Sequence, residues 1–171
     1  PDGYIVSMQN CINEERIAGL VGWGRTVGCI VAKISSDLME AGHVHRTVPM
    51  VGERGNAFYV GEVHGRTTKR IEELAAILRT GDSCAVTANL WGERWAKLCL
   101  NAMRNGVSAA TGLGGNARDK HQAARRFCIR LGGEAVRVGQ ALGFSFDEVV
   151  GYDPNTLARA AEGDQSALDA L

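Results

Sequence analysis

The stretch LWGERWAKLCLNAMRN, residues 90–105, marks the point at which the character of the chain changes. Its apolar residues recur at helical spacing and predict one amphipathic helix. The apolar sector of this helix consists of Trp91, Trp95, Leu98, Cys99 and Ala102. Gly106 is expected to end or kink the helix. Residues 1–88 mix strand and helix signals, whereas residues 89–171 carry helical signals alone, so an α/β part followed by an all-α part is predicted.

Short runs rich in β-branched residues predict several strands in the first part of the chain. The predicted strands span residues 4–8, 26–34, 43–50, 57–63 and 83–87. Of the strands over residues 26–34, 43–50 and 57–63, the later ones are expected to be antiparallel, because the links between them are too short for crossover helices. Asn13 is predicted to cap a helix that ends at Val21. A second helix is predicted over residues 68–80, with Gly81 just beyond it.

The all-α part is predicted to contain one long helix over residues 116–142, closed by Gly143. Gly132 and Gly133 lie in the middle of this helix. Glycine there costs stability unless another helix packs closely against it, so a close helical neighbour is expected.

Two further helix starts follow. Asp153 is predicted to cap a helix with Pro154 at its first position, running through Ala161. Asp164 or Ser166 is expected to cap a last helix.

The composition is that of an ordinary globular protein. Of 171 residues, 19 are Lys or Arg and 19 are Asp or Glu, a balance that argues against a nucleic acid or an anionic membrane surface as the main partner. No apolar run approaches the roughly 18 residues that a membrane span needs. The five cysteines show no CxxC spacing, which argues against a disulfide framework or a zinc knuckle. Reduced, mostly buried thiols in a soluble cytoplasmic protein are expected.

Lys97, Asn101 and Asn105 are spaced four residues apart on the predicted helix and form one polar stripe. The stripe is expected to flank the apolar sector. At the edge of a cleft, such a lysine can donate a proton to a carbonyl oxygen while the amides hold other oxygens of the same small molecule. The alternative is a solvated polar face, because Glu93, Arg94 and Arg104 lie in the same sector.

Gln9 and Asn10 follow the first predicted strand. Ligands of open α/β sheets bind beyond the carboxyl ends of strands, which makes this amide pair a candidate binding site. The alternative is a simple Asx turn before the next helix.

Two other patterns are interpreted as structural. Residues 112–117, GLGGNA, imitate a dinucleotide-binding fingerprint, but no strand precedes them, so they are predicted to link two helices. His43 and His45 share one face of a predicted strand, and they have no carboxylate or thiol at a ligand spacing that would indicate a metal site.

Several motifs occur in order along the chain: Ser7-Met8-Gln9-Asn10, Asn13-Glu14-Glu15, Leu90-Trp91, Trp95-Ala96-Lys97-Leu98 and the run from Asn101 to Asn105. Together they resemble the ketopantoate reductases, or 2-dehydropantoate 2-reductases, over most of the chain. The resemblance implies the latter half of a Rossmann-type nucleotide-binding domain in residues 1–88. It also implies an all-α substrate and dimerisation domain in residues 89–171, similar to the C-terminal domain of 6-phosphogluconate dehydrogenase.

The resemblance implies hydride transfer from NADPH to the ketone of a branched 2-oxo acid, 2-dehydropantoate or a relative, as in pantothenate biosynthesis. Lys97 is the implied catalytic acid, and it binds substrate together with Asn101 and Asn105. Asn10 is the implied cofactor-binding residue beside the nicotinamide. A cytoplasmic enzyme that forms homodimers, with no metal, nucleic acid or membrane partner, is expected.

The chain departs from the family pattern at three positions. Cys11 stands where the family usually has glycine, and Gly106 stands where proline commonly follows the second helix asparagine. A further substrate-binding asparagine of the family falls at Gly115, with Asn116 one place away. These departures leave a related 2-oxo acid open as the substrate.

Two segments of the family pattern are missing from this sequence: the glycine-rich phosphate loop and the later segment with a serine and a glutamate of the active site. The chain is therefore expected to be an internal piece of a longer enzyme and to be inactive alone. Two alternatives remain open. One is a non-catalytic helical interaction or dimerisation module, suggested by the close approach expected at Gly132 and Gly133. The other is a reductase relative that has lost activity.

Overall fold

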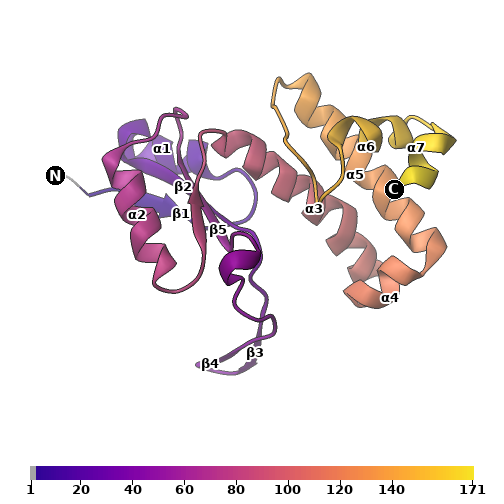
Figure 1. Ribbon diagram of the computed structural model, residues 1–171, viewed down its shortest axis with the longest axis horizontal. Coiled ribbons are helices and arrows are strands. Elements are labelled where there is room, and N and C mark those ends of the chain that lie inside the picture. Colours follow the sequence, from indigo (N-terminus) through magenta and orange to yellow (C-terminus); the bar gives the residue numbers. More distant parts are fainter. Residues whose placement is uncertain (1–2) are drawn as a thin grey trace. The chain divides into compact units, whose positions relative to one another are not determined.

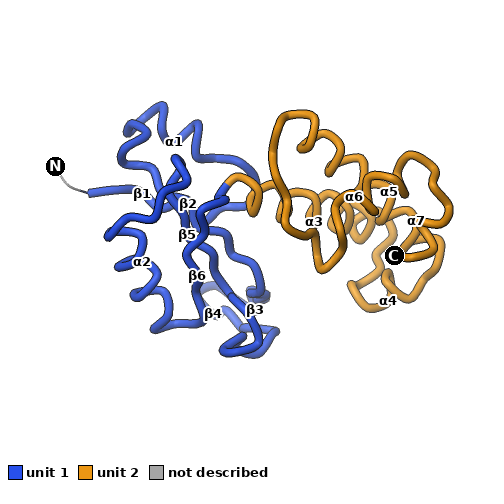
Figure 2. Tube along the Cα trace, turned by 45° about the horizontal axis from the view of Figure 1, so that its top comes forward, with its two compact units in different colours: residues 1–90 blue, residues 91–171 orange. Residues whose placement is uncertain are grey.

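The computed structural model describes residues 3–171. The chain divides into two compact units, the first ending at Leu90 and the second beginning at Trp91 (Figure 2). The first unit contains every strand among the described residues, and the second is helical.

A four-stranded mixed sheet in the order β1-β2-β5-β6 forms the centre of the first unit. Its strands are β1 (Ile5–Ser7), β2 (Thr26–Val31), β5 (Phe58–Glu62) and β6 (Cys84–Val86). β2 and β5 pair antiparallel, as predicted, with Cys29 opposite Val60. The two outer pairs, β1 with β2 and β5 with β6, are parallel. Each parallel pair is joined through a helix, as such pairs require.

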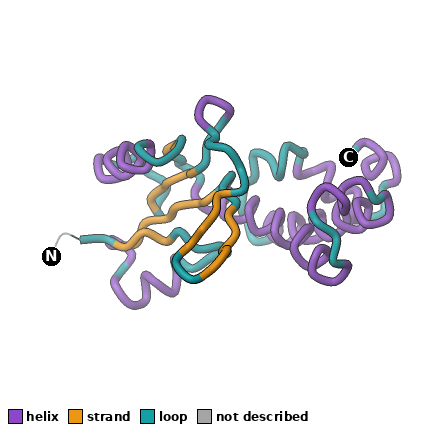
Figure 3. Tube along the Cα trace, turned by 90° about the horizontal axis from the view of Figure 1, so that it is seen from below, coloured by secondary structure: helices purple, strands orange, loops and turns teal. Residues whose placement is uncertain are grey.

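The helices α1 (Glu14–Val21) and α2 (Lys69–Arg79) lie on opposite sides of this sheet (Figure 3). α2 begins where the Thr68 side chain accepts a hydrogen bond from the Ile71 backbone. The buried core between α2 and the sheet consists of Val27, Cys29, Val60, Ile71, Leu74, Ala75 and Cys84. Asn13 is the N-cap residue of α1, as predicted, but its side chain makes no capping hydrogen bond. The Asn13 backbone is already helical, and its amide Nδ2 donates instead to the Asn10 carbonyl at 2.7 Å.

A two-stranded antiparallel hairpin, β3 (Ser36–Glu40) and β4 (His43–Arg46), extends away from the sheet (Figure 1). β3 was not predicted, because it is exposed along its whole length and therefore has no apolar alternation in its sequence. Two short 3₁₀ turns complete the first unit, η1 (Trp23–Arg25) and η2 (Gly52–Arg54).

The second unit consists of α3 (Leu90–Thr111), α4 (Gly115–Lys120), α5 (Gln122–Ala141), α6 (Pro154–Ala161) and α7 (Gln165–Ala170). α3 does not end at Gly106, one of the two outcomes predicted there, because Val107 is the next buried residue of its apolar row. The helix predicted over residues 116–142 is in fact two helices. His121 has an extended backbone between them, and its Nδ1 accepts a hydrogen bond from the Ala124 N–H, which caps α5.

The close helical neighbour expected at the glycine pair of α5 is present within the chain. Met103 of α3 packs on Gly132, and the Leu157 carbonyl of α6 packs on Gly133. The glycine pair therefore has no room for a helix of another protein, which removes the observation behind the interaction-module alternative.

The predicted caps of the last two helices are confirmed. The Asp153 carboxylate accepts a hydrogen bond from the Thr156 N–H at 2.9 Å, and Asp164 accepts one from the Ala167 N–H at 3.0 Å. Among the helices of residues 3–171, none combines the length and apolar character needed to cross a bilayer.

Candidate active site

Two rows of side chains, both at four-residue spacing, run along opposite faces of α3. The first row consists of Trp95, Cys99, Met103 and Val107, all of which are buried. Met103 and Val107 pack against Cys128 of α5, and the Trp95 ring stacks on Phe144 with ring centroids 5.1 Å apart. This row anchors α3 and so determines which face of the helix remains for chemistry.

The second row consists of Glu93, Lys97, Asn101 and Asn105. At about 100° per residue, this row lies roughly 160° around the helix from the buried one. The polar stripe therefore lies opposite this buried row, while the buried Leu90 and Arg94 lie on the stripe's own side of the helix. The true packing face includes Met103 and Val107, which lie beyond the apolar sector expected from sequence.

Lys97 and Asn101 are half-buried although they lie opposite the packing face, while Asn105 is exposed. Burial lowers the pKa of the Lys97 ammonium, because removal from water disfavours the charged form. A lysine with a lowered pKa is a stronger acid than a free one, and it gives up its proton more readily to a developing alkoxide.

Glu93 lies one helical turn before Lys97, and in the sequence it was one of the residues that supported the alternative of a solvated face. It is half-buried, and burial raises the pKa of its carboxyl, helped by the negative charges of Asp147 and Glu148. The four-residue spacing between Glu93 and Lys97 is the sequence signal from which Glu93 could have been predicted as a site residue. The row thus combines a lysine and a glutamate whose pKa values are shifted toward each other.

Trp95 adds a feature that spacing could not reveal. Its indole Nε1 is buried and has no hydrogen-bond partner within residues 3–171. Gly139 of α5 allows this ring to approach, since a Cβ there would lie 3.0 Å from a Trp95 ring carbon. This close packing holds α3 against α5 on the side of the helix away from the polar row.

Asn10 belongs to the first unit, in the exposed segment after β1. Its carbonyl oxygen accepts the hydrogen bond from Asn13 Nδ2, so the segment forms a tight turn at the carboxyl end of the strand. Cys11 follows with φ of 68°, in the left-handed region that glycine adopts without strain. The position therefore suits glycine, and the exposed Cys11 side chain is a real departure there.

The structure also shows where the patterns interpreted as structural lie. Residues 112–117 link α3 to α4, with Gly112 at φ of 70° ending α3. His43 and His45 lie exposed on β4, and no three His, Cys, Asp or Glu side chains among residues 3–171 come together as a metal site. Four of the five cysteines are buried and none forms a disulfide within that range.

Comparison with known proteins supports the resemblance. Residues 89–168 match the family model described as Ketopantoate reductase PanE/ApbA C terminal. The 2-dehydropantoate 2-reductase from Geobacter metallireducens GS-15 has 31% identity and a TM-score of 0.75, over 95% of this chain and 52% of that one. No match was found among curated proteins.

Two more distant structures share the fold. A D-mandelate dehydrogenase in complex with NADH matches at 17% identity and a TM-score of 0.73, over 98% of this chain and 53% of that one. A dimeric ketopantoate reductase from Staphylococcus aureus matches at 18% identity and a TM-score of 0.62, over 98% of this chain and 65% of that one.

The expected architecture, an α/β sheet unit of Rossmann type followed by an all-α unit, is confirmed by the structure and by these matches. The chain spans 52% of the length of the Geobacter structure. The family model matches residues 89–168, and a solved member matches 95% of the chain at 31% identity, so the chain belongs to the ketopantoate reductase family.

Proposed function

We propose that the protein containing this chain reduces a 2-oxo acid to the 2-hydroxy acid with hydride from a nicotinamide cofactor. The observation that carries this proposal is the half-buried Lys97, whose lowered pKa suits a proton donor, beside Asn101 on the same face of α3. Membership of an oxidoreductase family supports the reaction class.

In this proposal Lys97 donates its proton to the ketone oxygen while hydride adds to the carbonyl carbon. The carbon is reduced, the oxygen becomes a hydroxyl, and Lys97 is left neutral until it regains a proton from water. Asn101 and Asn105 donate amide hydrogens to substrate oxygens and so fix the ketone with its oxygen toward the ammonium. The rigid buried row of α3 keeps these three side chains in one line.

The cofactor supplies the hydride when bound. Asn10, exposed in the turn beyond β1, fits the nicotinamide end, because its amide lies at the carboxyl end of a parallel strand. Residues 3–171 contain no strand-to-helix glycine loop that could bind the pyrophosphate of the cofactor. The glycine-rich run 112–117 joins two helices, and no strand feeds into it.

More specifically, we propose that the cofactor is NADP and that the substrate is a branched 2-oxo acid, 2-dehydropantoate or a relative. The Geobacter structure is named as a 2-dehydropantoate 2-reductase, which supports the substrate. The D-mandelate dehydrogenase complex contains NADH, which leaves the choice of nicotinamide cofactor to experiment. A cytoplasmic homodimer is part of the same proposal, supported by the dimeric Staphylococcus aureus enzyme.

The test is a turnover assay on the longest gene product that contains this chain. Oxidation of NADPH and of NADH is followed by absorbance with 2-dehydropantoate, an unbranched 2-oxo acid and phenylglyoxylate as substrates. We expect the branched acid with NADPH to give the highest kcat/KM. Absence of turnover with every pair, from a folded protein that binds either cofactor, would contradict the proposal and support an inactive relative.

A further inference from the structure

The first unit contains a hollow of about 460 Å³ that the proposed reaction does not use. It lies between the segment that follows β2 and the segment that follows β4. Its walls are apolar and consist of Ala32, Ile34, Val48, Pro49 and Val51. The volume falls in the usual range of small-molecule sites, about 300–1,000 Å³.

Two cations, Lys33 and Arg54, lie at the rim of this hollow. Within the described part of the chain neither has a carboxylate at ion-pair distance, and the residues lining the hollow include no Asp or Glu. Lys33 reaches across the rim, since a Cβ on Gly55 would lie 2.8 Å from its Nζ. The Arg54 Nη2 donates to the Met50 carbonyl at 2.9 Å, which fixes the guanidinium.

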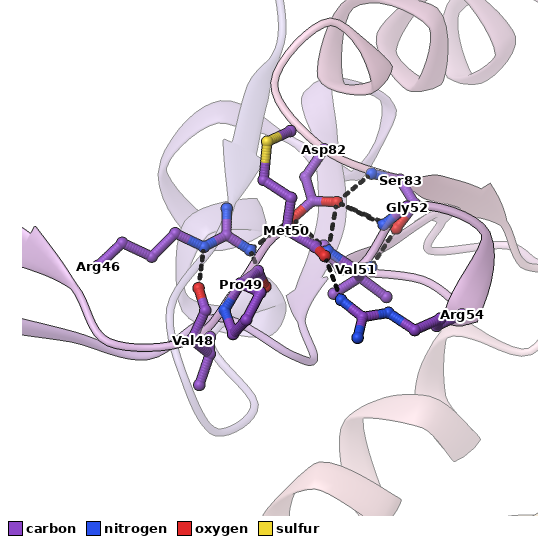
Figure 4. A network of polar contacts seen from close by, with 10 residues as sticks. Arg46, Val48, Pro49, Met50, Val51, Gly52, Arg54, Asp82 and Ser83 are labelled. Atoms are coloured by element: carbon purple, nitrogen blue, oxygen red, sulfur yellow. Dashed lines mark hydrogen bonds and ion pairs between the residues drawn. The ribbon is translucent and has the colours of Figure 1, made fainter.

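One wall of the hollow is held in place by the buried carboxylate of Asp82 (Figure 4). Asp82 accepts hydrogen bonds from the backbone N–H groups of Val51 at 3.1 Å and Gly52 at 3.2 Å. Arg46 binds the same carboxylate and also donates to the Val48 carbonyl at 2.9 Å. The negative charge of Asp82 is therefore matched locally and does not offset Lys33 and Arg54.

The opposite wall is fixed by backbone contacts of the sheet. The Ala32 N–H donates to the Ala57 carbonyl at 2.8 Å, and the Thr47 N–H donates to the Ser35 carbonyl at 2.9 Å. The second contact ties the segment after β2 to the segment after β4. The hollow is thus built from two anchored segments, and a ligand would find it preformed.

We propose that this hollow binds a small amphipathic carboxylate. Its hydrocarbon part lies on the apolar walls, and its carboxylate lies between Lys33 and Arg54, where the planar guanidinium favours two-point recognition. No lining residue belongs to α3, so the site is separate in composition from the Lys97 row.

Hexanoate is the probe, with n-hexanol as its uncharged analogue, added to the isotopically labelled 171-residue chain. Amide proton and nitrogen shifts report the location of binding. Hexanoate is expected to shift the amides of residues 32–35 and 48–54 and to bind at least about tenfold more tightly than n-hexanol, since hydrogen bonds to charged groups contribute on that scale. Equal affinity for the two probes, shifts confined to α3, or no binding at millimolar concentration would each overturn the proposal.

Variants locate the site. Lys33→Gln combined with Arg54→Gln is expected to weaken hexanoate binding about tenfold or more, and Ala32→Leu is expected to weaken it by filling the hollow. Arg66→Gln combined with Lys69→Gln removes two exposed cations elsewhere in the first unit and should leave affinity unchanged. Equal loss in both double variants would show nonspecific attraction of an anion and would contradict the proposal.

Discussion

Gly133 of α5 lies directly against the backbone carbonyl of Leu157 in α6. A Cβ on this glycine would stand 2.1 Å from that oxygen and 2.6 Å from the Ala161 Cβ. Gly133→Ala should therefore force the two helices apart and lower the free energy of unfolding of the second unit by about 1–3 kcal/mol, the usual range for overpacking. Urea denaturation followed by far-ultraviolet circular dichroism measures the change.

Gly106 provides the matched control, because it lies inside α3 and, apart from its chain neighbours and the adjacent helix backbone, no atom lies within 4 Å of its ideal Cβ. Gly106→Ala should stabilise the helix by up to about 1 kcal/mol through propensity alone. Equal destabilisation by the two substitutions would show that the close contact between α5 and α6 is not what requires glycine.

Sequence patterns predicted those helix features that depend on local chemistry. Asp153 and Asp164 were identified as caps because a short acidic side chain at a helix start bonds the first N–H groups wherever the helix lies. The break at His121 was missed because no proline or glycine marks it. It is made locally, by the His121 side chain that accepts a hydrogen bond from the Ala124 N–H and so starts α5 as a separate helix.

The buried Asp82 carboxylate should make the stability of the first unit depend on pH. Removal from water favours its neutral form, but hydrogen bonds from Arg46 and from the N–H groups of Ser83, Val51 and Gly52 lower its pKa well below the usual range. A depressed pKa stabilises the folded state above about pH 4, and that stabilisation is lost as the pH falls further. Asp82→Asn should lower Tm at neutral pH and flatten its decline in acid.

Asp37→Asn is the control for this series, because Asp37 is exposed on the β3–β4 hairpin. Its Tm should follow that of the unmodified chain across the acid range. Parallel Tm curves for Asp82→Asn and the unmodified chain would contradict the role given to the Asp82 carboxylate.

Replacement of the buried Glu62 should also have a large effect on the stability of the first unit. Its carboxylate is fully buried at the end of β5 and accepts two hydrogen bonds from Arg70, at 2.7 and 2.5 Å, and one from Thr68. Glu62→Gln removes the charge that pairs with Arg70 and should cost about 2–4 kcal/mol of unfolding free energy. The exposed Glu73→Gln change on α2 should cost less than about 0.5 kcal/mol. If chemical denaturation gave similar losses of unfolding free energy for Glu62→Gln and Glu73→Gln, the importance of burial at Glu62 would be refuted.

The two asparagines of the α3 row should differ in their contributions to substrate binding. Asn101 is half-buried and Asn105 is exposed, so a hydrogen bond from Asn101 is made in a drier environment. Asn101→Ala should raise KM for the 2-oxo acid about tenfold, and Asn105→Ala should raise it less. Gln122→Ala, at an exposed position of α5, is the control and should leave KM unchanged. An unchanged KM in Asn101→Ala would exclude this residue from substrate binding.

The candidate site was predictable to the extent that one helix determines it. The spacing of Lys97, Asn101 and Asn105 places them in line on any helix. The direction in which the line faces depends on which residues pack, and Met103 and Val107 made the buried row longer than the apolar sector suggested. The raised pKa of Glu93 could not be foreseen, because it comes first from burial in the folded chain and then from Asp147 and Glu148, which lie far away in the sequence.

The lowered pKa of Lys97 predicts the alkaline side of the pH profile. A general acid must be protonated, so kcat should fall as the pH rises through the pKa of Lys97. Because burial lowers that pKa, the fall should begin below the value of about 10.4 for a free lysine. A kcat that stays constant up to that value would show that the active enzyme does not use this ammonium as its acid.

The most direct test of the account is kcat of Lys97→Ala in the longest gene product containing this chain, compared with Lys120→Ala at an exposed position of α4. If Lys97 donates the proton to the ketone, its removal should lower kcat by about two to four powers of ten, while Lys120→Ala should have no effect. A Lys97→Ala enzyme that is folded, binds the 2-oxo acid and retains the kcat of the unmodified protein would contradict the central claim.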